Sequence, residues 1–384
     1  MYALIGCGKC GCSLLGTFMK VQRKFARFLY HPIAVSSTID DLVRSGTNPD
    51  NWLGITRTGD LVVGREKGFG QKITGGLGKD FSRGNSIFSQ EEDWLVDYFE
   101  EMLPSHGSEE EKERINFVLL FFGLGGGTGG GGAPVIAKVF KNRGIPVIGI
   151  GVLPAESEGY GWAWNAYRSF NEVLGSLDGF MVADNMLIDR PGGLGTLYDS
   201  FNSYIVGCVA DFIFGGVGAG PRVKHGGMAS LDYVDLISSL TIGNNKKGVG
   251  ILGRSTVNMG YFGGLKDFEH GKWLRNALSQ LTLDMEIGDN LKKLAGVGTI
   301  HGSLKKGFPF YELEEDLRDI TYMKQAYVGF NETKERLAKL TLSLTYDPND
   351  IPRLGRLRDR AEKYIELSGE QQIQLPEDKL FENA

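Results

Sequence analysis

The 384-residue chain is poor in cysteine, histidine and proline, with four, five and twelve of each, and its net charge is −5. Four cysteines are too few for a disulfide framework, which indicates a reducing compartment. Lysine and arginine form no cluster, which argues against a nucleic-acid groove. No run reaches 18 apolar residues, and the opening MYALIGCG resembles a strand rather than a signal peptide. We therefore expect a cytoplasmic protein without a transmembrane segment.

Three of the cysteines, Cys7, Cys10 and Cys12, spell C-x-x-C-x-C, a pattern that metal or redox sites also use. They lie in a glycine-rich turn between a strand and a helix, and the sequence supplies no fourth ligand nearby. We favour the interpretation that small residues are tolerated here beside a ligand, and we predict no metal site made by the protein.

Glycine, in contrast, is abundant: its 56 residues are about twice the average share. One cluster, GCGKCG at residues 6–11, follows the apolar run YALI and opens a helix. A second, GGGTGGGG at residues 125–132, lies between INFVLLFF and a helix expected from about residue 133 to 142. Bare backbone N–H groups at such junctions bind phosphates, and Thr128 adds a hydroxyl. A flexible linker does not suit this position between a buried strand and its helix.

Short apolar runs alternate with amphipathic stretches through the first half of the chain. This alternation predicts an α/β fold with a parallel, doubly wound sheet and ligands at the carboxyl ends of its strands. Apolar residues then recur at helical spacing over residues 197–213, which predicts one long buried helix. The remainder is typical of a further α+β unit.

These motifs together resemble the tubulin/FtsZ superfamily of polymerising GTPases, whose signature is GGGTG followed by small residues. The resemblance runs in order through GCGKCGCS, STIDDL, TGGLGKD, GGGTGGGGAP, LPAESEG, ADN, FNSYIVG and SLDYVDL. It implies a Rossmann-like GTP-binding domain over residues 1–195, a central core helix over 196–216, a smaller α+β domain over 217–345, and a C-terminal helix with a polar tail over 346–384.

The resemblance also implies a GTP/GDP site, with Mg²⁺ expected beside the phosphates. Glu158 would contact the ribose, and Asn185 and Asn202 would contact the guanine, as suits a carboxylate and two amides. The implied nucleotide-binding residues are Gly8, Lys9, Cys10, Gly11, Cys12, Ser13, Gly76, Gly125, Gly126, Gly127, Thr128, Gly129, Gly130, Glu158, Asn185 and Asn202.

Two acidic residues in SLDYVDL, Asp232 and Asp235, resemble the catalytic acids that polarise the attacking water in a neighbouring subunit. Their spacing puts both carboxylates on one side of a helix start, where an aspartate is equally often a cap. The resemblance implies that GTP is hydrolysed only inside a head-to-tail contact between copies, so that assembly activates the enzyme.

The pattern departs from bacterial FtsZ at several positions. Cys12 and Ser13 replace Gly-Asn, Trp162 replaces a basic residue, and Ser230 replaces an asparagine. The end of the chain, QLPEDKLFENA, lacks an FtsZ-like adaptor motif, so a membrane adaptor is unknown. These departures are similar to the archaeal tubulin-like CetZ group, which implies cell-shape control, with an FtsZ-type division ring as the alternative.

Two further readings belong to other classes of protein. One is a GTP-binding scaffold with little hydrolysis, suggested by Ser230 and Trp162. The other is an NAD-type oxidoreductase that uses GCGKCG with Asp40 or Asp41 at the ribose. It would need a proton-handling histidine, and none of the five lies in a recognisable catalytic motif; they are His31, His106, His225, His270 and His301.

Overall fold

A computed structural model describes most of the chain. The described residues are 2–22, 30–73, 75–103, 115–188, 194–213, 231–243, 246–258, 269–304, 308–321, 326–333 and 335–368. Ser230 and the C-terminal segment 369–384 lie outside them.

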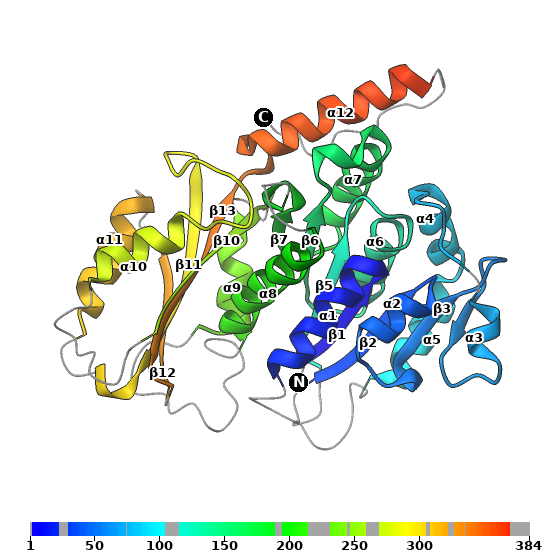
Figure 1. Ribbon diagram of the computed structural model, residues 1–384, viewed down its shortest axis with the longest axis horizontal. Helices are drawn as coiled ribbons and strands as arrows, with labels where there is room; N and C mark the ends of the chain where they lie inside the picture. The colour runs from blue at the N-terminus through cyan, green and yellow to red at the C-terminus, as the bar shows by residue number, and fades with distance from the viewer. Residues whose placement is uncertain are drawn as a thin grey trace.

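Eleven strands form one sheet that runs through the molecule (Figure 1). The strands within the described residues are β1 (Tyr2–Cys7), β2 (Tyr30–Ser36), β3 (Trp52–Ile55), β4 (Leu61–Val63), β5 (Phe117–Gly123), β6 (Val147–Leu153), β7 (Gly179–Asp184), β8 (Thr241–Ile242), β9 (Lys246–Lys247), β10 (Val249–Asn258), β11 (Leu291–His301), β12 (Ala326–Thr333) and β13 (Leu337–Tyr346). The large sheet has the order β12-β11-β13-β10-β7-β6-β5-β1-β2-β3-β4, and β8 pairs with β9 separately.

Strands β3, β2, β1, β5, β6, β7 and β10 are parallel neighbours. Strand β4 runs antiparallel to β3, and β13 runs antiparallel to both β10 and β11. The predicted α/β class with a mostly parallel sheet is confirmed.

The helices within the described residues are α1 (Gly8–Gln22), α2 (Ile39–Arg44), α3 (Phe69–Lys72), α4 (Phe81–Gln90), α5 (Glu92–Met102), α6 (Gly127–Asn142), α7 (Tyr160–Leu174), α8 (Leu194–Phe212), α9 (Tyr233–Ser239), α10 (His270–Leu278), α11 (Phe310–Thr321) and α12 (Pro352–Ser368).

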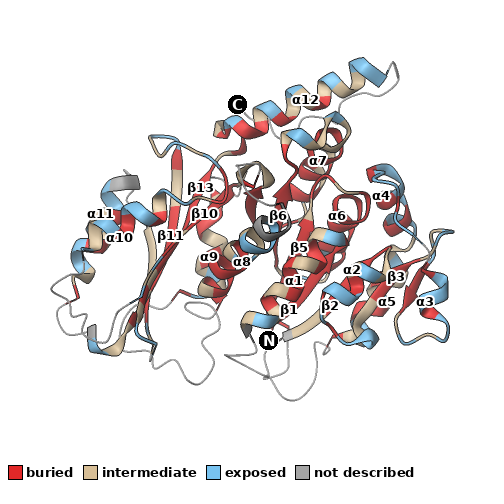
Figure 2. Cartoon of the chain, viewed as in Figure 1, coloured by how far each residue is buried: buried red, intermediate tan, exposed pale blue. Residues whose placement is uncertain are grey.

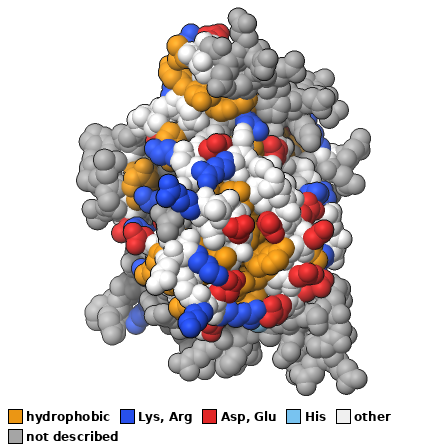
Figure 3. Space-filling model, turned by 90° about the vertical axis from the view of Figure 1, so that its right-hand side faces the viewer, with side chains coloured by type: hydrophobic (Ala, Val, Ile, Leu, Met, Phe, Trp, Pro, Cys, Tyr) orange, Lys and Arg blue, Asp and Glu red, His pale blue; other side chains and the backbone are white. Residues whose placement is uncertain are grey.

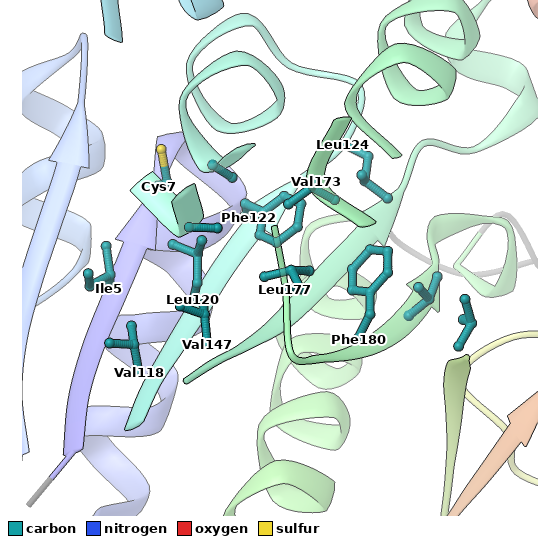
Figure 4. Close-up of a cluster of buried hydrophobic side chains, with 14 of the residues drawn as sticks. Ile5, Cys7, Val118, Leu120, Phe122, Leu124, Val147, Val173, Leu177 and Phe180 are labelled. Carbon is teal, nitrogen blue, oxygen red and sulfur yellow. The ribbon is translucent and has the colours of Figure 1, made fainter. Parts of the chain in front are cut away.

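Both faces of the sheet are covered, because the strands are apolar on both sides (Figure 2). Successive residues of β5 point to opposite faces: Phe121 packs on Phe18 of α1, with ring centroids 5.8 Å apart. Phe122 stacks on Phe180 of β7 at 6.0 Å, on the face that α6 and α7 cover (Figure 4). Each fully buried phenylalanine stabilises the fold by roughly 2 kcal/mol.

Helix α6 begins at Gly127, so the expected start near residue 133 is wrong. Most of the second glycine cluster is helix rather than loop, because α4 and α6 pack at backbone distance. A Cβ on Gly131 would lie 2.5 Å from the backbone nitrogen of Asn85, and a Cβ on Gly84 would lie 2.1 Å from the carbonyl oxygen of Gly127. These two glycines are therefore required for the packing of α4 against α6.

In the large sheet, the fewest residues are paired between β7 and β10. These strands share two register pairs, Met181 with Gly250 and Val182 with Ile251. This seam joins the strands before the central helix α8 to those after it. The division of the chain into domains stays a prediction, since one continuous sheet passes through the proposed boundary.

Acidic and basic side chains both occur on the face at the right of Figure 1, which Figure 3 shows. Among the exposed ion pairs are Arg65 with Glu101 at 2.5 Å and Lys72 with Glu66 at 2.6 Å. Within the described ranges, no helix combines the length and apolar character needed to cross a membrane.

Candidate functional site

A cavity of about 550 Å³ opens at the carboxyl ends of β1, β5, β6 and β7, with α8 along one side. This is the edge at which a parallel sheet binds ligands. The lining residues are Cys7, Gly8, Lys9, Cys10, Ser13, Arg44, Gly123, Gly125, Gly126, Gly129, Val152, Pro154, Glu158, Trp162, Asn185, Tyr198, Asp199 and Asn202.

The cavity brings together residues that the sequence places far apart. Ten of the nucleotide-binding residues implied by the resemblance lie in its wall, namely Gly8, Lys9, Cys10, Ser13, Gly125, Gly126, Gly129, Glu158, Asn185 and Asn202. The remaining ones, and the two proposed catalytic acids, lie elsewhere.

The first glycine turn joins β1 to α1. Gly8 has φ +70°, a left-handed conformation that favours glycine, and a Cβ there would lie 2.8 Å from the backbone nitrogen of Gly129. The two glycine turns therefore touch. Gly11 and Cys12 do not line the cavity: Gly11 packs against the Phe121 carbonyl, and the buried Cys12 thiol donates to the carbonyl of Gly6 at 3.5 Å.

The second glycine turn joins β5 to α6. Gly126 is the N-cap of α6, with φ −92°, and a Cβ there would meet no atom within 4 Å. Its surroundings are therefore open to a ligand, beside the free N–H groups of a helix start. Gly127 and Gly130 instead pack on backbone, at 2.8 Å from Asp80 and 2.5 Å from Leu124 when a Cβ is placed on them.

Thr128 lies behind this turn rather than in the cavity wall. Its hydroxyl is 3.0 Å from the hydroxyl of Ser37, and both residues are buried. The loop that holds Gly76 lies next to this pair, since a Cβ on Gly76 would be 4.0 Å from the Ser37 hydroxyl. Three loops that the resemblance implies are thus adjacent: the second glycine turn, the loop after β2 and the loop that holds Gly76. The hydroxyls of Thr128 and Ser37 join the second glycine turn to the loop after β2.

Asn165 of α7, which the sequence did not single out, ties the Gly76 loop to the second turn. Its buried amide donates to the carbonyl of Lys79 at 2.6 Å and to the carbonyl of Gly125 at 3.1 Å. Lys79 has φ +61°, and its ammonium lies 4.6 Å from the ring centroid of Trp162 in the cavity wall. A cation is therefore held beside the cavity through Trp162.

Glu158, Asn185 and Asn202 also line the cavity. One oxygen of Glu158 accepts the backbone N–H of Ala155 at 2.9 Å, within the short 3₁₀ turn η3 (Glu156–Glu158). Asn185 begins the 3₁₀ turn η4 (Asn185–Leu187), directly after β7. Carboxylate and amide groups at this position suit a polar ring and sugar hydroxyls.

Sequence reasoning missed Tyr198, Asp199 and Arg44 in this wall. Tyr198 had a readable signal, because it precedes Asn202 by four residues and so shares its helical face. Its aromatic ring can stack on a nucleobase. Arg44 had no such signal, since its place in the wall comes from the packing of α2 against α1.

The thiols in the wall are neutral at physiological pH. Burial, together with a smaller effect of the nearby Glu158 carboxylate, raises the pKa of Cys10 to about 12. Burial also raises the pKa of Cys7. Neutral thiols add no charge that would repel an anion. Nowhere in the described part of the chain do three His, Cys, Asp or Glu side chains converge in a way that could hold a metal ion.

Asp232 and Asp235 lie near the amino ends of the parallel strands, whereas the cavity lies at their carboxyl ends. Tyr233 stacks on Phe117, the first residue of β5, with centroids 5.5 Å apart. The glycine turn follows the other end of β5, and seven residues of strand span roughly 20 Å. The two acids cap α9 reciprocally: each carboxylate accepts the other residue's backbone N–H, at 2.8 and 3.1 Å.

Comparison with known proteins agrees with this geometry. Residues 104–190 match the model of the Tubulin/FtsZ family, GTPase domain. The tubulin-like protein CetZ3 of Haloferax volcanii is 31% identical over 265 residues, which cover 67% of this chain and 60% of that relative. The chain thus spans less than two thirds of the length of this relative.

Solved structures show the same fold over nearly the whole chain. CetZ1 of H. volcanii, a GDP-bound monomer, has a TM-score of 0.74 at 24% identity and covers 95% of this chain and 99% of that chain. CetZ2 of H. volcanii, a GTPγS-bound protofilament, has a TM-score of 0.73 at 20% identity and covers 96% and 100%. With its glycine turns in one cavity and the family's domain match, the chain belongs to the tubulin/FtsZ superfamily and is similar to its archaeal CetZ members.

Proposed function

We propose that this protein binds GTP, assembles head to tail into filaments and hydrolyses GTP to GDP and phosphate at the contact between copies. The observation that carries the proposal is the placement of two sets of groups. The cavity with its glycine turns lies at one edge of the sheet, and Asp232 and Asp235 lie at the other. Stacked copies would bring the acids of one to the cavity of the next.

The residues that line the cavity suit the phosphates, the base and the ribose of a guanine nucleotide. The open space at Gly126 and the N-terminus of α6 would hold phosphates. Asn185 and Asn202 would pair with the guanine edge, Tyr198 would stack on it, and Glu158 would accept hydrogen bonds from the ribose. Mg²⁺ would be held mainly by phosphate oxygens and water, as is usual for this ion with nucleotides.

Asp232 and Asp235 would polarise and orient the water that attacks the γ-phosphate bound by the neighbouring copy. Within one chain they are too far from the cavity to do so. Hydrolysis would then depend on assembly, and loss of the γ-phosphate would weaken the contact. We further propose a cytoplasmic filament with a role in cell shape, with a division ring as the alternative.

The test is the rate of phosphate release per protein molecule as protein concentration rises. We expect the rate to rise steeply above a threshold concentration, together with sedimentation in GTP and not in GDP. A flat dependence would reject the shared site.

A second candidate is a GTP-binding scaffold with little hydrolysis. It is favoured by the reciprocal capping of α9, which already uses one oxygen of each acid. A scaffold would sediment with GTP while releasing little phosphate at any concentration, so the same experiment separates the two.

A further inference from the structure

Helix α12 lies on the outside of the molecule and packs against α7 (Figure 1). Its second residue, Arg353, is only 2% exposed. A buried guanidinium is expensive unless it is fully paired, and a buried ion pair stabilises a fold little better than apolar residues would. The contacts of Arg353 therefore indicate what it positions.

Arg353 joins two loops that form the cavity wall. Its Nε donates to Asp184 Oδ2 at 2.6 Å, and its Nη2 donates to the carbonyl of Pro154 at 2.6 Å. Pro154 lines the cavity, and Asp184 directly precedes Asn185, which also lines it. The guanidinium thus bridges the ends of the neighbouring strands β6 and β7.

The two loops are themselves short, capped turns. Asp184 Oδ1 accepts the backbone N–H of Met186 at 3.1 Å, which closes η4 around Asn185. The η3 turn that presents Glu158 receives a second contact from α12, because Arg360 donates to the Glu156 carbonyl at 2.6 Å. No flexible segment separates Arg353 from the atoms facing the cavity.

We propose that Arg353 is a positioning residue of the nucleotide site, through which α12 orients Glu158 and Asn185 toward the ribose and base of a guanine nucleotide. This inference rests on the proposed function. Among the described residues, Arg353 bonds to neither glycine turn. Its loss should therefore weaken recognition of the base and sugar and leave the phosphate contacts in place.

The test compares Arg353→Met with Arg356→Met in the full-length protein. Arg356 is on the same helix but exposed, and its guanidinium pairs with the Glu156 side chain at 3.2 Å. Two quantities are measured: the dissociation rate of GDP, and the ratio of affinities for GDP and IDP, which lacks the guanine amino group. We expect R353M to release GDP about tenfold faster with a smaller GDP/IDP ratio, and R356M to match the wild type.

Arg353→Met leaves the buried Asp184 carboxylate unpaired, which can unfold the protein. The double variant R353M/D184N removes that charge and keeps an acceptor for the Met186 N–H. We expect it to unfold near the wild-type temperature and still release GDP fast, because the Pro154 carbonyl has lost its donor. A merely structural role predicts that stability and GDP retention recover together.

Wild-type GDP release and an unchanged GDP/IDP ratio in R353M/D184N would overturn the inference alone. A wild-type protein that binds neither nucleotide would overturn the proposed function and this inference with it.

Discussion

Asp232 and Asp235 cap each other across the first turn of α9, with the Asp235 N–H donating to Asp232 Oδ1 at 2.8 Å and the Asp232 N–H donating to Asp235 Oδ2 at 3.1 Å. A cap and a catalytic acid need different things of the same side chain. A cap needs an acceptor oxygen, whereas polarising water needs the negative charge.

Asp232→Asn and Asp232→Ala separate these roles. Asparagine keeps the cap, so we expect almost unchanged stability and a loss of phosphate release of about a hundredfold. Alanine should lose the same activity and also about 1 kcal/mol of unfolding free energy. Urea unfolding and phosphate release measure the two effects. Wild-type hydrolysis by D232N would leave the pair as a cap only and favour the scaffold.

Mixing two defective proteins tests whether the site is shared. Asp232→Asn keeps the cavity, and a bulky Gly126→Val variant keeps the acids. We expect each alone to be slow and an equimolar mixture to regain phosphate release, because the acids of one copy complete the cavity of the other. If the acids acted within their own chain, mixing would restore nothing.

An added methyl group should weaken GTP binding at Gly126 and disrupt the fold at Gly11. Alanine at Gly126 meets no atom within 4 Å at an ordinary φ, so we expect a normally stable protein with weakened GTP binding. Alanine at Gly11 would lie 2.1 Å from the Phe121 carbonyl oxygen, so we expect it to disrupt the fold. Calorimetry of GTP binding and thermal unfolding are the measurements. Gly175→Ala, also in open space but outside the cavity wall, serves as the control. Unchanged GTP binding by G126A would place the phosphates elsewhere.

The buried hydroxyl pair of Thr128 and Ser37 predicts a double-mutant cycle. Thr128→Val leaves the Ser37 hydroxyl unpaired, so we expect a loss of about 1–2 kcal/mol in the free energy of unfolding. Adding Ser37→Ala should recover much of that loss, because no buried hydroxyl then lacks its partner. Additive losses in urea unfolding would show that the two hydroxyls do not interact.

The thiol of Cys10 predicts a loss of stability in alkali. Its pKa is raised from the ordinary 9.0 to about 12 in the folded protein. The folded state therefore holds its proton more tightly, so this stability is complete below pH 9 and declines as the pH rises toward 12. The slope is at most about 1.4 kcal/mol per pH unit for one thiol. Cys10→Ala should have a shallower decline in urea unfolding between pH 9 and 10.5, and an unchanged slope would contradict the assignment.

Much of the site was readable from the sequence because glycine clusters between a strand and a helix have a local meaning. Gly8 and Gly126 were found in that way. Arg353 and Arg44 were not, because their roles come from helices that pack back on the sheet from elsewhere in the chain. Such tertiary placement leaves no short-range pattern.

The start of α6 shows the opposite limit. Glycine-rich sequence predicts a loop, since glycine disfavours a helix by about 1 kcal/mol per residue relative to alanine. Here that penalty is outweighed by the close approach of α4, which any Cβ on Gly131 would prevent. The α/β class and parallel sheet were predictable because they follow from the alternation of whole segments rather than from any boundary.

Helix α6 is consequently not stable outside the folded protein. A peptide of residues 127–142 cut from the protein would be a random coil in water, because its first turns have almost no propensity to nucleate. During folding, this segment becomes helical only when β1, β5 and α4 pack against it. We therefore expect the turn that we propose to bind phosphate to be among the last parts of the molecule to acquire its native form.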